Sequence, residues 1–273
     1  SENLFKGLSP WMQKLPGGLI HVNVVGCALF AAISGSSAAT VATVGKMSIP
    51  ELRKRNYPEK ILLGSLAGSG TLGLLIPPSI ILIIYGVAVQ ESIAKLFIAG
   101  IIPGIMIALI FMSYVIIWSL INKKEMPQIL EEYSFLEKIK RSKQLLPVIL
   151  LIFSVIGSIY TGIATATEAS SLGVVGALIL SYFQKTLNLE TFKSSLLGAT
   201  KTSCMIAFIL AGSSFLSLAM GFTGLPRNLA IWIQSMDLSP YVLILVLMIF
   251  YIILGMFLDG ISAVVLTMAI IEP

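Results

Sequence analysis

The stretch Ile33-Ser34-Gly35-Ser36-Ser37-Ala38 interrupts an uncharged apolar segment and decides how that segment folds. A straight helix over residues 17–45 would be about 44 Å long, against a hydrocarbon core of about 30 Å. Non-helical backbone at membrane depth is tolerated only where it is buried in protein or lines a wet cavity. We therefore expect a re-entrant helical hairpin whose turn presents carbonyl and hydroxyl oxygens to something polar.

The composition places the chain in a membrane. Of its 273 residues, 56% are hydrophobic and 11% are charged, and the mean hydropathy is +0.95. A soluble domain of this composition would have too little polar surface. We expect an all-α integral membrane protein, because a transmembrane barrel would alternate polar and apolar residues along short strands. The uncharged runs that predict helices cover roughly residues 22–45, 61–90, 96–122, 144–167, 169–184, 202–226 and 238–258.

Basic residues gather in three loops, at 46–60, 122–144 and 184–201. By the positive-inside rule these loops face the cytoplasm. The net charge of +5 is then an orientation signal, and we expect no nucleic-acid partner. This orientation leaves two short spans over 145–184, one span over about 199–220, and an external loop with an interfacial helix over 222–240.

Residues 241–271 repeat the plan of the first hairpin. Asp259-Gly260-Ile261-Ser262-Ala263 lies between two apolar arms, as Ser34-Gly35-Ser36-Ser37-Ala38 does. The charge pattern predicts that the two hairpins enter from opposite sides, which is the mark of inverted-topology repeats. We expect one membrane domain over 1–273, a fragment of a longer chain because Ser1 is not a start methionine and an apolar run leads directly to Pro273. Its predicted parts are a first repeat at 17–121 (hairpin, broken helix and following span), a cytoplasmic loop at 122–144, and a partial second repeat at 145–273 with its hairpin at 241–273.

A second break is predicted at Pro77-Pro78, within the run from Gly73 to Ser79. Both prolines lack an N–H, so the carbonyls around Gly73 and Leu74 lose their helical partners. Facing the Ser34–Ser37 turn, these oxygens would complete a site for a hard cation such as Na⁺. Two alternatives stay open: a hinge of small residues at a helix contact, and a proline kink relieved by neighbouring Ser or Thr groups.

Two carboxylates lie in otherwise apolar surroundings. An ionised carboxylate at membrane depth normally faces a cavity or a partner, so we favour ion coordination or organisation of the second tip for Asp259 over plain helix capping. Glu168 belongs to Thr165-Ala166-Thr167-Glu168, the pattern of a capping box, and we expect it to cap a helix. His21, the only histidine, is interpreted as an interfacial or packing residue.

Several chemistries are not expected. The sequence has no phosphate-binding Gly-x4-Gly-Lys-Ser/Thr loop and no cluster of metal-ligating Cys and His residues. An intramembrane serine hydrolase using Ser36 or Ser37 is a remote alternative, because a general base must lie within hydrogen-bond distance and His21 is distant in sequence. We therefore do not expect the protein to be an enzyme.

Taken together, these motifs resemble the large membrane subunit of the tripartite ATP-independent periplasmic (TRAP) transporters. The residues that carry the resemblance span most of the chain: His21-Val22-Asn23-Val24, Ile33 to Ser37, Gly73 to Ser79, Ile83-Ile84-Tyr85-Gly86, Lys95 to Gly104, Tyr160-Thr161-Gly162, Thr167-Glu168-Ala169, and Gly255 to Gly260.

The resemblance implies a multi-pass protein of the bacterial or archaeal inner membrane that imports organic acids by symport with Na⁺. It implies an elevator mechanism like that of the ion transporter superfamily, a small membrane subunit that is separate or fused, and a periplasmic substrate-binding protein. Sialic acid, C4-dicarboxylates and sugar acids all remain open as substrates, and a Na⁺/dicarboxylate symporter that needs no binding protein is the alternative. The predicted Na⁺ ligands are Ser34, Gly35, Ser36, Ser37, Gly73, Leu75, Ile76, Pro77, Asp259 and Gly260, and the predicted substrate contacts are Ser36, Ser37, Thr40, Pro78 and Ser262.

Overall fold

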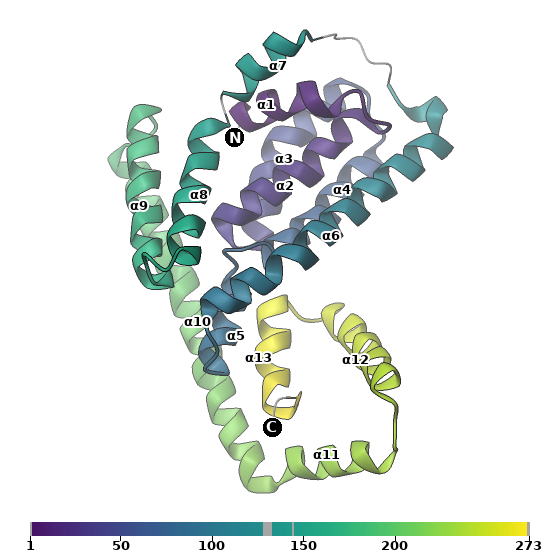
Figure 1. Ribbon diagram of the computed structural model, residues 1–273, viewed down its shortest axis with the longest axis vertical. Helices are drawn as coiled ribbons and strands as arrows, with labels where there is room; N and C mark the ends of the chain where they lie inside the picture. The colour runs from purple at the N-terminus through teal and green to yellow at the C-terminus, as the bar shows by residue number, and fades with distance from the viewer. Residues whose placement is uncertain (1, 128–132, 144, 272–273) are drawn as a thin grey trace. The chain divides into compact units, whose positions relative to one another are not determined.

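The computed structural model describes residues 2–127, 133–143 and 145–271 as helices and short connections, without a strand (Figure 1). The helices fall into two compact units, residues 1–183 and 184–273. Three of them are long and apolar enough to cross a membrane, namely Ile93–Ile121, Ala166–Phe183 and Leu189–Thr223, and a bent pair adds a fourth candidate span. The protein is therefore an all-helical, multi-pass membrane protein, as its composition predicts.

The first unit is built around a helical hairpin. Helices α2 and α3 fold back on each other, and α1 and α4 pack against them (Figure 1). Buried apolar side chains from these four helices, such as Phe5, Val22, Val44 and Leu62, form its main core. The elements of the unit are α1 (Glu2–Met12), η1 (Gly18–Ile20), α2 (His21–Ser34), α3 (Ser37–Lys54), α4 (Glu59–Gly70), η2 (Thr71–Leu74), α5 (Ile80–Ala88), α6 (Ile93–Ile121), η3 (Lys123–Glu125), α7 (Phe135–Ser142), α8 (Leu146–Tyr160) and α9 (Ala166–Phe183).

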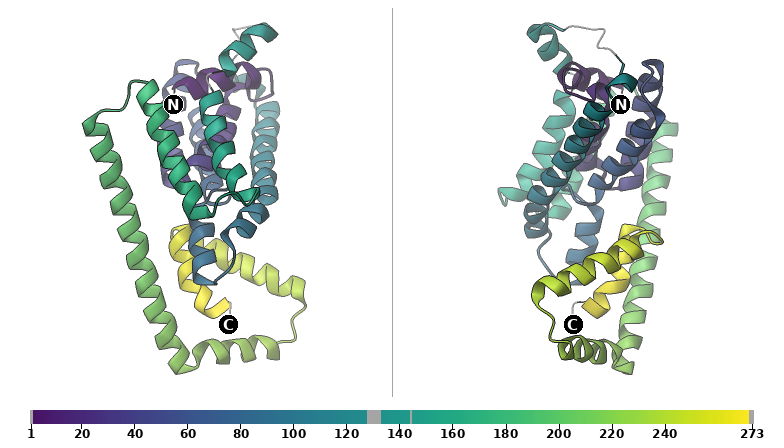
Figure 2. Two further views of the ribbon diagram at one scale, coloured as in Figure 1. Left: turned by 60° about the vertical axis from the view of Figure 1, so that its left-hand side comes forward. Right: turned by 90° about the vertical axis from the view of Figure 1, so that its right-hand side faces the viewer.

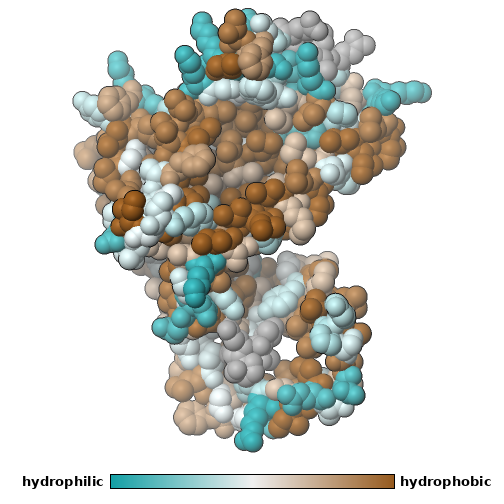
Figure 3. Space-filling view, viewed as in Figure 1, coloured by the Kyte–Doolittle hydropathy of each residue, from teal (hydrophilic) through white to brown (hydrophobic). Residues whose placement is uncertain are grey.

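Helices α8 and α9 form a second pair that runs side by side in every view (Figure 2). The stretch 145–184, for which two short spans are predicted, contains these two helices joined by a short turn. Gly176 of α9 allows the close approach, because a Cβ there would lie 2.4 Å from Cδ1 of Leu151. Apolar side chains cover much of the visible face of the first unit, whereas hydrophilic ones gather at the end that carries α1 and α7 (Figure 3).

The second unit contains α10 (Leu189–Thr223), α11 (Leu225–Ser235), α12 (Pro240–Gly255) and α13 (Gly260–Ile271). Helix α10 contains the predicted span over about 199–220, but it begins at Leu189, so much of the loop predicted at 184–201 is helical. The reason is local: the Asn188 side chain caps the helix by accepting a hydrogen bond from the Thr191 N–H at 2.7 Å. Arms α12 and α13 meet through the hydroxyls of Tyr251 and Thr267, 2.7 Å apart and eight residues on either side of Asp259.

Candidate functional site

The first predicted turn is a two-residue break between helices. Helix α2 ends at Ser34, Gly35 adopts a left-handed conformation with φ 59°, and Ser36 caps α3. A side chain at Gly35 would be strained by this φ and would also place Cβ 2.9 Å from the carbonyl oxygen of Pro78. Glycine is therefore required here for conformation and for space.

Hydroxyl groups surround the Ser36 carbonyl inside this turn. Thr40, which is fully buried, donates its hydroxyl to the Ser36 oxygen at 2.7 Å, and its backbone N–H donates to the same oxygen at 3.0 Å. The Ser34 hydroxyl lies 2.8 Å from the Thr40 hydroxyl and 3.3 Å from the Ser36 oxygen. A hydroxyl that donates its proton keeps its oxygen lone pairs, so this arrangement can turn hydroxyl oxygens toward a cation.

The second break is the non-helical segment 75–79 between η2 and α5. The Leu75 and Ile76 N–H groups both donate to the Leu72 carbonyl, which closes η2 before the two prolines. The Ser79 hydroxyl, fully buried, donates to the Leu74 carbonyl at 2.5 Å. At Leu74 the structure thus matches the alternative of a proline break relieved by a serine.

The structure brings the turn and the break into direct contact. The Ile80 N–H, at the start of α5, donates to the Gly35 carbonyl at 3.2 Å. Gly73 lies so close to the turn that a Cβ there would be 2.9 Å from the carbonyl carbon and oxygen of Ser36. The expected neighbourhood of the Ser34–Ser37 turn and the Gly73–Pro78 segment is thus present, although its ion-binding role stays a prediction.

Helix α6 closes the other side of the break through two glycines. A Cβ at Gly100 would lie 2.8 Å from the Leu75 carbonyl oxygen, and one at Gly104 would lie 2.9 Å from a side-chain carbon of Ile76. Sequence reasoning did not assign these glycines to the site. Their spacing of four residues, which puts both on one helix face, is the signal that could have found them.

Asp259 lies at the second break, between α12 and α13. Its Oδ2 accepts hydrogen bonds from the Ile261 N–H at 3.2 Å and the Ser262 N–H at 3.4 Å, and the residue is exposed. This is the geometry of a helix cap, the interpretation that the sequence analysis ranked second. Gly260 and Ser262 lie in the first turn of α13, and an ion-binding role for this second tip stays a prediction.

Glu168 caps a helix and His21 packs in the interior, as the sequence predicts. Thr165 and Glu168 form the expected capping box: the Thr165 N–H donates to Glu168 Oε2 at 2.8 Å, and the Glu168 N–H donates to the Thr165 hydroxyl at 3.3 Å. His21 is fully buried and its Nε2 lies 2.8 Å from the Pro16 carbonyl oxygen, as befits a packing residue. His21 and Ser36 flank opposite ends of α2, about 20 Å apart by helical rise, so they cannot act as a catalytic pair.

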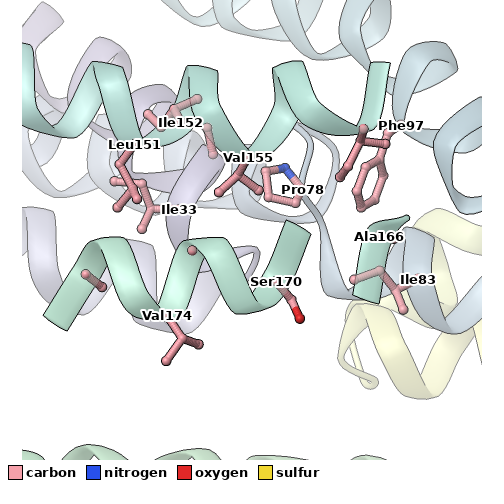
Figure 4. A pocket seen from close by; sticks show the side chains of 14 residues that line it. Ile33, Pro78, Ile83, Phe97, Leu151, Ile152, Val155, Ala166, Ser170 and Val174 are labelled. Atoms are coloured by element: carbon pink, nitrogen blue, oxygen red, sulfur yellow. The ribbon is translucent and has the colours of Figure 1, made fainter. Parts of the chain in front are cut away.

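An apolar cavity of about 350 Å³ lies beside the turn and the break, between them and the pair α8–α9 (Figure 4). Ile33, Pro78 and Phe97 line it from one side, and Val155 and Val174 line it from the other. Ser170 is the only residue with a polar side chain in the lining, and no charged residue contributes. This cavity therefore lacks the groups that would bind an organic anion.

Sequence comparisons show which proteins the chain resembles. Residues 2–273 match the family model described as tripartite ATP-independent periplasmic transporter, DctM component. A C4-dicarboxylate TRAP transporter large permease protein of Pseudomonas aeruginosa is 36% identical over 93% of this chain and 58% of the relative. A sialic acid TRAP transporter large permease protein of Vibrio cholerae is 31% identical over 100% of this chain and 64% of the relative. A 2,3-diketo-L-gulonate TRAP transporter large permease protein of Escherichia coli is 31% identical over 94% and 60%.

The chain thus spans about three fifths of the length of these curated relatives. The match nevertheless runs over almost all of the chain, including the turn, the break and both glycines of α6. The protein therefore belongs to the DctM component family of the tripartite ATP-independent periplasmic transporters, a family of transporters and not of enzymes.

Proposed function

We propose that this chain is part of the translocating membrane subunit of a Na⁺-coupled importer of organic acid anions in a bacterial or archaeal inner membrane. The observation that carries the proposal is the contact between the turn of the α2–α3 hairpin and the proline break, made by the Ile80 N–H and the Gly35 carbonyl at 3.2 Å. Two interrupted helices that meet within an apolar protein bring main-chain oxygens together away from lipid.

The chemistry of this contact suits Na⁺ as a transported coupling ion. Na⁺ is a hard cation that prefers oxygen ligands, and the turn offers the hydroxyls of Ser34, Ser36 and Thr40, with Gly73 of the interrupted segment packed against the Ser36 backbone. Gly100 of α6 packs against the Leu75 carbonyl oxygen and Gly104 packs against Ile76, so protein covers this side of the break. We assign the predicted Na⁺ ligands of the first site to this contact, and we assign Asp259 and Gly260 to a second site at the other tip.

The transported solute is an organic acid anion. Relatives of this chain are named for C4-dicarboxylates, sialic acid, 2,3-diketo-L-gulonate and isethionate, all of which carry an acidic group. The N–H groups at the start of α3, which follow Ser36, can donate to such an anion. We propose Ser36, Ser37, Thr40 and Pro78 as substrate contacts from the first tip, with Ser262 from the second.

We further propose the partners that the family implies. These are a small membrane subunit and a periplasmic substrate-binding protein that delivers the anion. A relative from Oleidesulfovibrio alaskensis is named permease protein DctMQ, which favours the large and small subunits being fused in some members. Transport would then proceed by an elevator movement that carries the two inverted hairpins across the membrane together.

The test is uptake by proteoliposomes that contain the full-length protein, its small subunit and its binding protein. We expect uptake with Na⁺ and none when K⁺ replaces Na⁺. The variants Ser36→Ala and Thr40→Ala should raise the Na⁺ concentration for half-maximal uptake by about tenfold, roughly 1.4 kcal/mol of lost binding. Ser154→Ala is the matched control, because Ser154 is an exposed serine of α8 whose hydroxyl bonds only within its own helix.

Each outcome separates one part of the proposal. Equal uptake in Na⁺ and K⁺ would refute Na⁺ coupling. Uptake that persists when the substrate-binding protein is left out would favour a symporter that needs no binding protein. Asp259→Asn keeps a capping oxygen but removes the charge, so an unchanged Na⁺ dependence in this variant would remove Asp259 from the ion site.

A further inference from the structure

Helix α7 is a short amphipathic helix in the most basic loop of the chain. Its eight residues are Phe-Leu-Glu-Lys-Ile-Lys-Arg-Ser, and Lys143 follows directly. At the angular spacing of an α-helix, Phe135, Leu136 and Ile139 share one face. The N–H of Ser134 donates to Glu137 Oε2 at 2.9 Å in a capping box, so the N-terminus of the helix is capped by local side chains.

Among the residues that the structure describes, α7 packs mainly on α1. The Trp11 ring of α1 packs edge-on against Phe135 with ring centroids 6.2 Å apart, and its Nε1–H donates to the Ser142 hydroxyl at 2.8 Å. Leu136, by contrast, is 76% exposed and Ile139 is 42% exposed. The apolar strip of α7 thus points away from the part of the protein that the structure describes.

Helices α7 and α8 are the bent pair counted above as a candidate span, and they point in different directions. Its axis makes an angle of 57° with that of α8, the apolar helix that follows it. The start of α8 is held on α1, where Leu145 packs on Gly7 so closely that a Cβ at Gly7 would lie 2.7 Å from Leu145 Cγ. Helix α7 is therefore turned away from the direction of α8, at the end of the unit where hydrophilic side chains gather (Figure 3).

We propose that α7 docks on the anionic lipid headgroups of the leaflet it faces, with Leu136 and Ile139 inserted below them. Lys140 and Lys143, both exposed, lie one helical turn beyond Leu136 and Ile139, so their long side chains can reach phosphate groups while the apolar strip stays in the acyl region. Each such lysine near an anionic surface contributes roughly a fewfold change in binding. Basic side chains directly beside an exposed apolar face favour an anionic lipid surface, and protein cover of the same face is one of the outcomes that the experiment distinguishes.

The experiment measures the depth of α7 in liposomes by spin labelling. The full-length protein, with its small subunit and in a cysteine-free background, carries a nitroxide at Leu136→Cys, Ile139→Cys or, as the polar reference, Glu137→Cys. Accessibility to oxygen, which partitions into lipid, is compared with accessibility to a water-soluble nickel chelate. In liposomes with phosphatidylglycerol we expect labels at 136 and 139 to favour oxygen and the label at 137 to favour the chelate.

Lipid charge provides the second arm. The double variant Lys140→Gln/Lys143→Gln should lower the ratio of inserted to lifted α7 by about 30-fold, because each lysine contributes about 1 kcal/mol of attraction to the anionic surface. Liposomes of pure phosphatidylcholine should also lower this ratio for the unmodified chain. The matched control is Lys185→Gln/Lys193→Gln, which removes two positive charges from another basic loop and should leave α7 inserted.

Three results would overturn the proposal. The first is a label at 136 that favours the chelate in anionic liposomes, and the second is an insertion depth that does not depend on lipid charge. The third is a label at 136 that is shielded from both reagents, which would show that protein covers the strip. Free inorganic phosphate at millimolar concentration should not reproduce the effect of phosphatidylglycerol.

Discussion

Replacing Gly73 by alanine tests the contact on which the proposed site depends. Gly73 lies in η2, outside the left-handed region of φ, so alanine can adopt its backbone conformation. The obstacle is space: the added Cβ would lie 2.9 Å from the carbonyl carbon and oxygen of Ser36 and 3.0 Å from the Ser37 nitrogen. These are backbone atoms of the hairpin turn, which cannot rotate away as a flexible side chain can.

The magnitude follows from two opposing effects. Moving the turn and the break apart by about 0.5 Å, to ordinary van der Waals distance, is overpacking of the kind that costs about 1–3 kcal/mol. Alanine also gains about 1 kcal/mol over glycine in a helix. Gly64→Ala has the gain in helix preference without the overpacking, because Gly64 is an exposed helical glycine of α4 whose Cβ would meet nothing within 4 Å. The difference in stability between the two variants therefore measures the overpacking at Gly73.

The assay is thermal unfolding of the full-length protein in detergent, followed by Na⁺-dependent uptake in proteoliposomes. For a difference of about 2 kcal/mol, Gly73→Ala should melt about 2–4 °C below Gly64→Ala. We also expect a weaker dependence of uptake on Na⁺ in Gly73→Ala, because the turn and the break no longer meet. Equal melting temperatures and equal Na⁺ dependence in the two variants would refute the reasoning, since the turn and the break would then not be in contact.

The effects of four other substitutions are predicted from local geometry and burial. Thr165→Ala should lower stability by about 1 kcal/mol through loss of the capping box, whereas Glu168→Gln should be nearly neutral because glutamine can also close the box, and thermal melting measures both. Asn23→Ala should cost about 1–3 kcal/mol, because the fully buried amide donates to the Leu62 carbonyl at 3.2 Å and alanine leaves that oxygen without this partner. Burial raises the pKa of the Tyr57 hydroxyl above its ordinary value of 10.0. The folded state therefore favours the protonated Tyr57, and this contribution to stability is complete below about pH 10 and is lost as the pH rises through the raised pKa. Between pH 8 and 11 the melting temperature should therefore decrease less for Tyr57→Phe than for the unmodified chain.

Much of the architecture was predictable because it follows from local chemistry. The apolar runs predict membrane helices, since lipid offers no partner for free N–H and C=O groups. Gly35 and the two prolines mark helix breaks because one residue has no Cβ and the others have no N–H. The Thr165–Glu168 cap is likewise a contact within one turn of helix. The early start of α10 was missed although its Asn188 cap is also local, because the hydropathy signal begins later than the helix.

The sequence by itself thus determined that the chain is helical, crosses a membrane and is interrupted at Gly35, Pro77 and Asp259. Only the tertiary structure decided which atoms meet at those breaks: the Ile80 N–H with the Gly35 carbonyl, Gly73 with the Ser36 backbone, and the glycines of α6 with Leu75 and Ile76. The physical reason is range. A helix break depends on a few neighbouring residues, whereas the approach of two breaks depends on how whole helices pack, which glycine permits but no short stretch of sequence specifies.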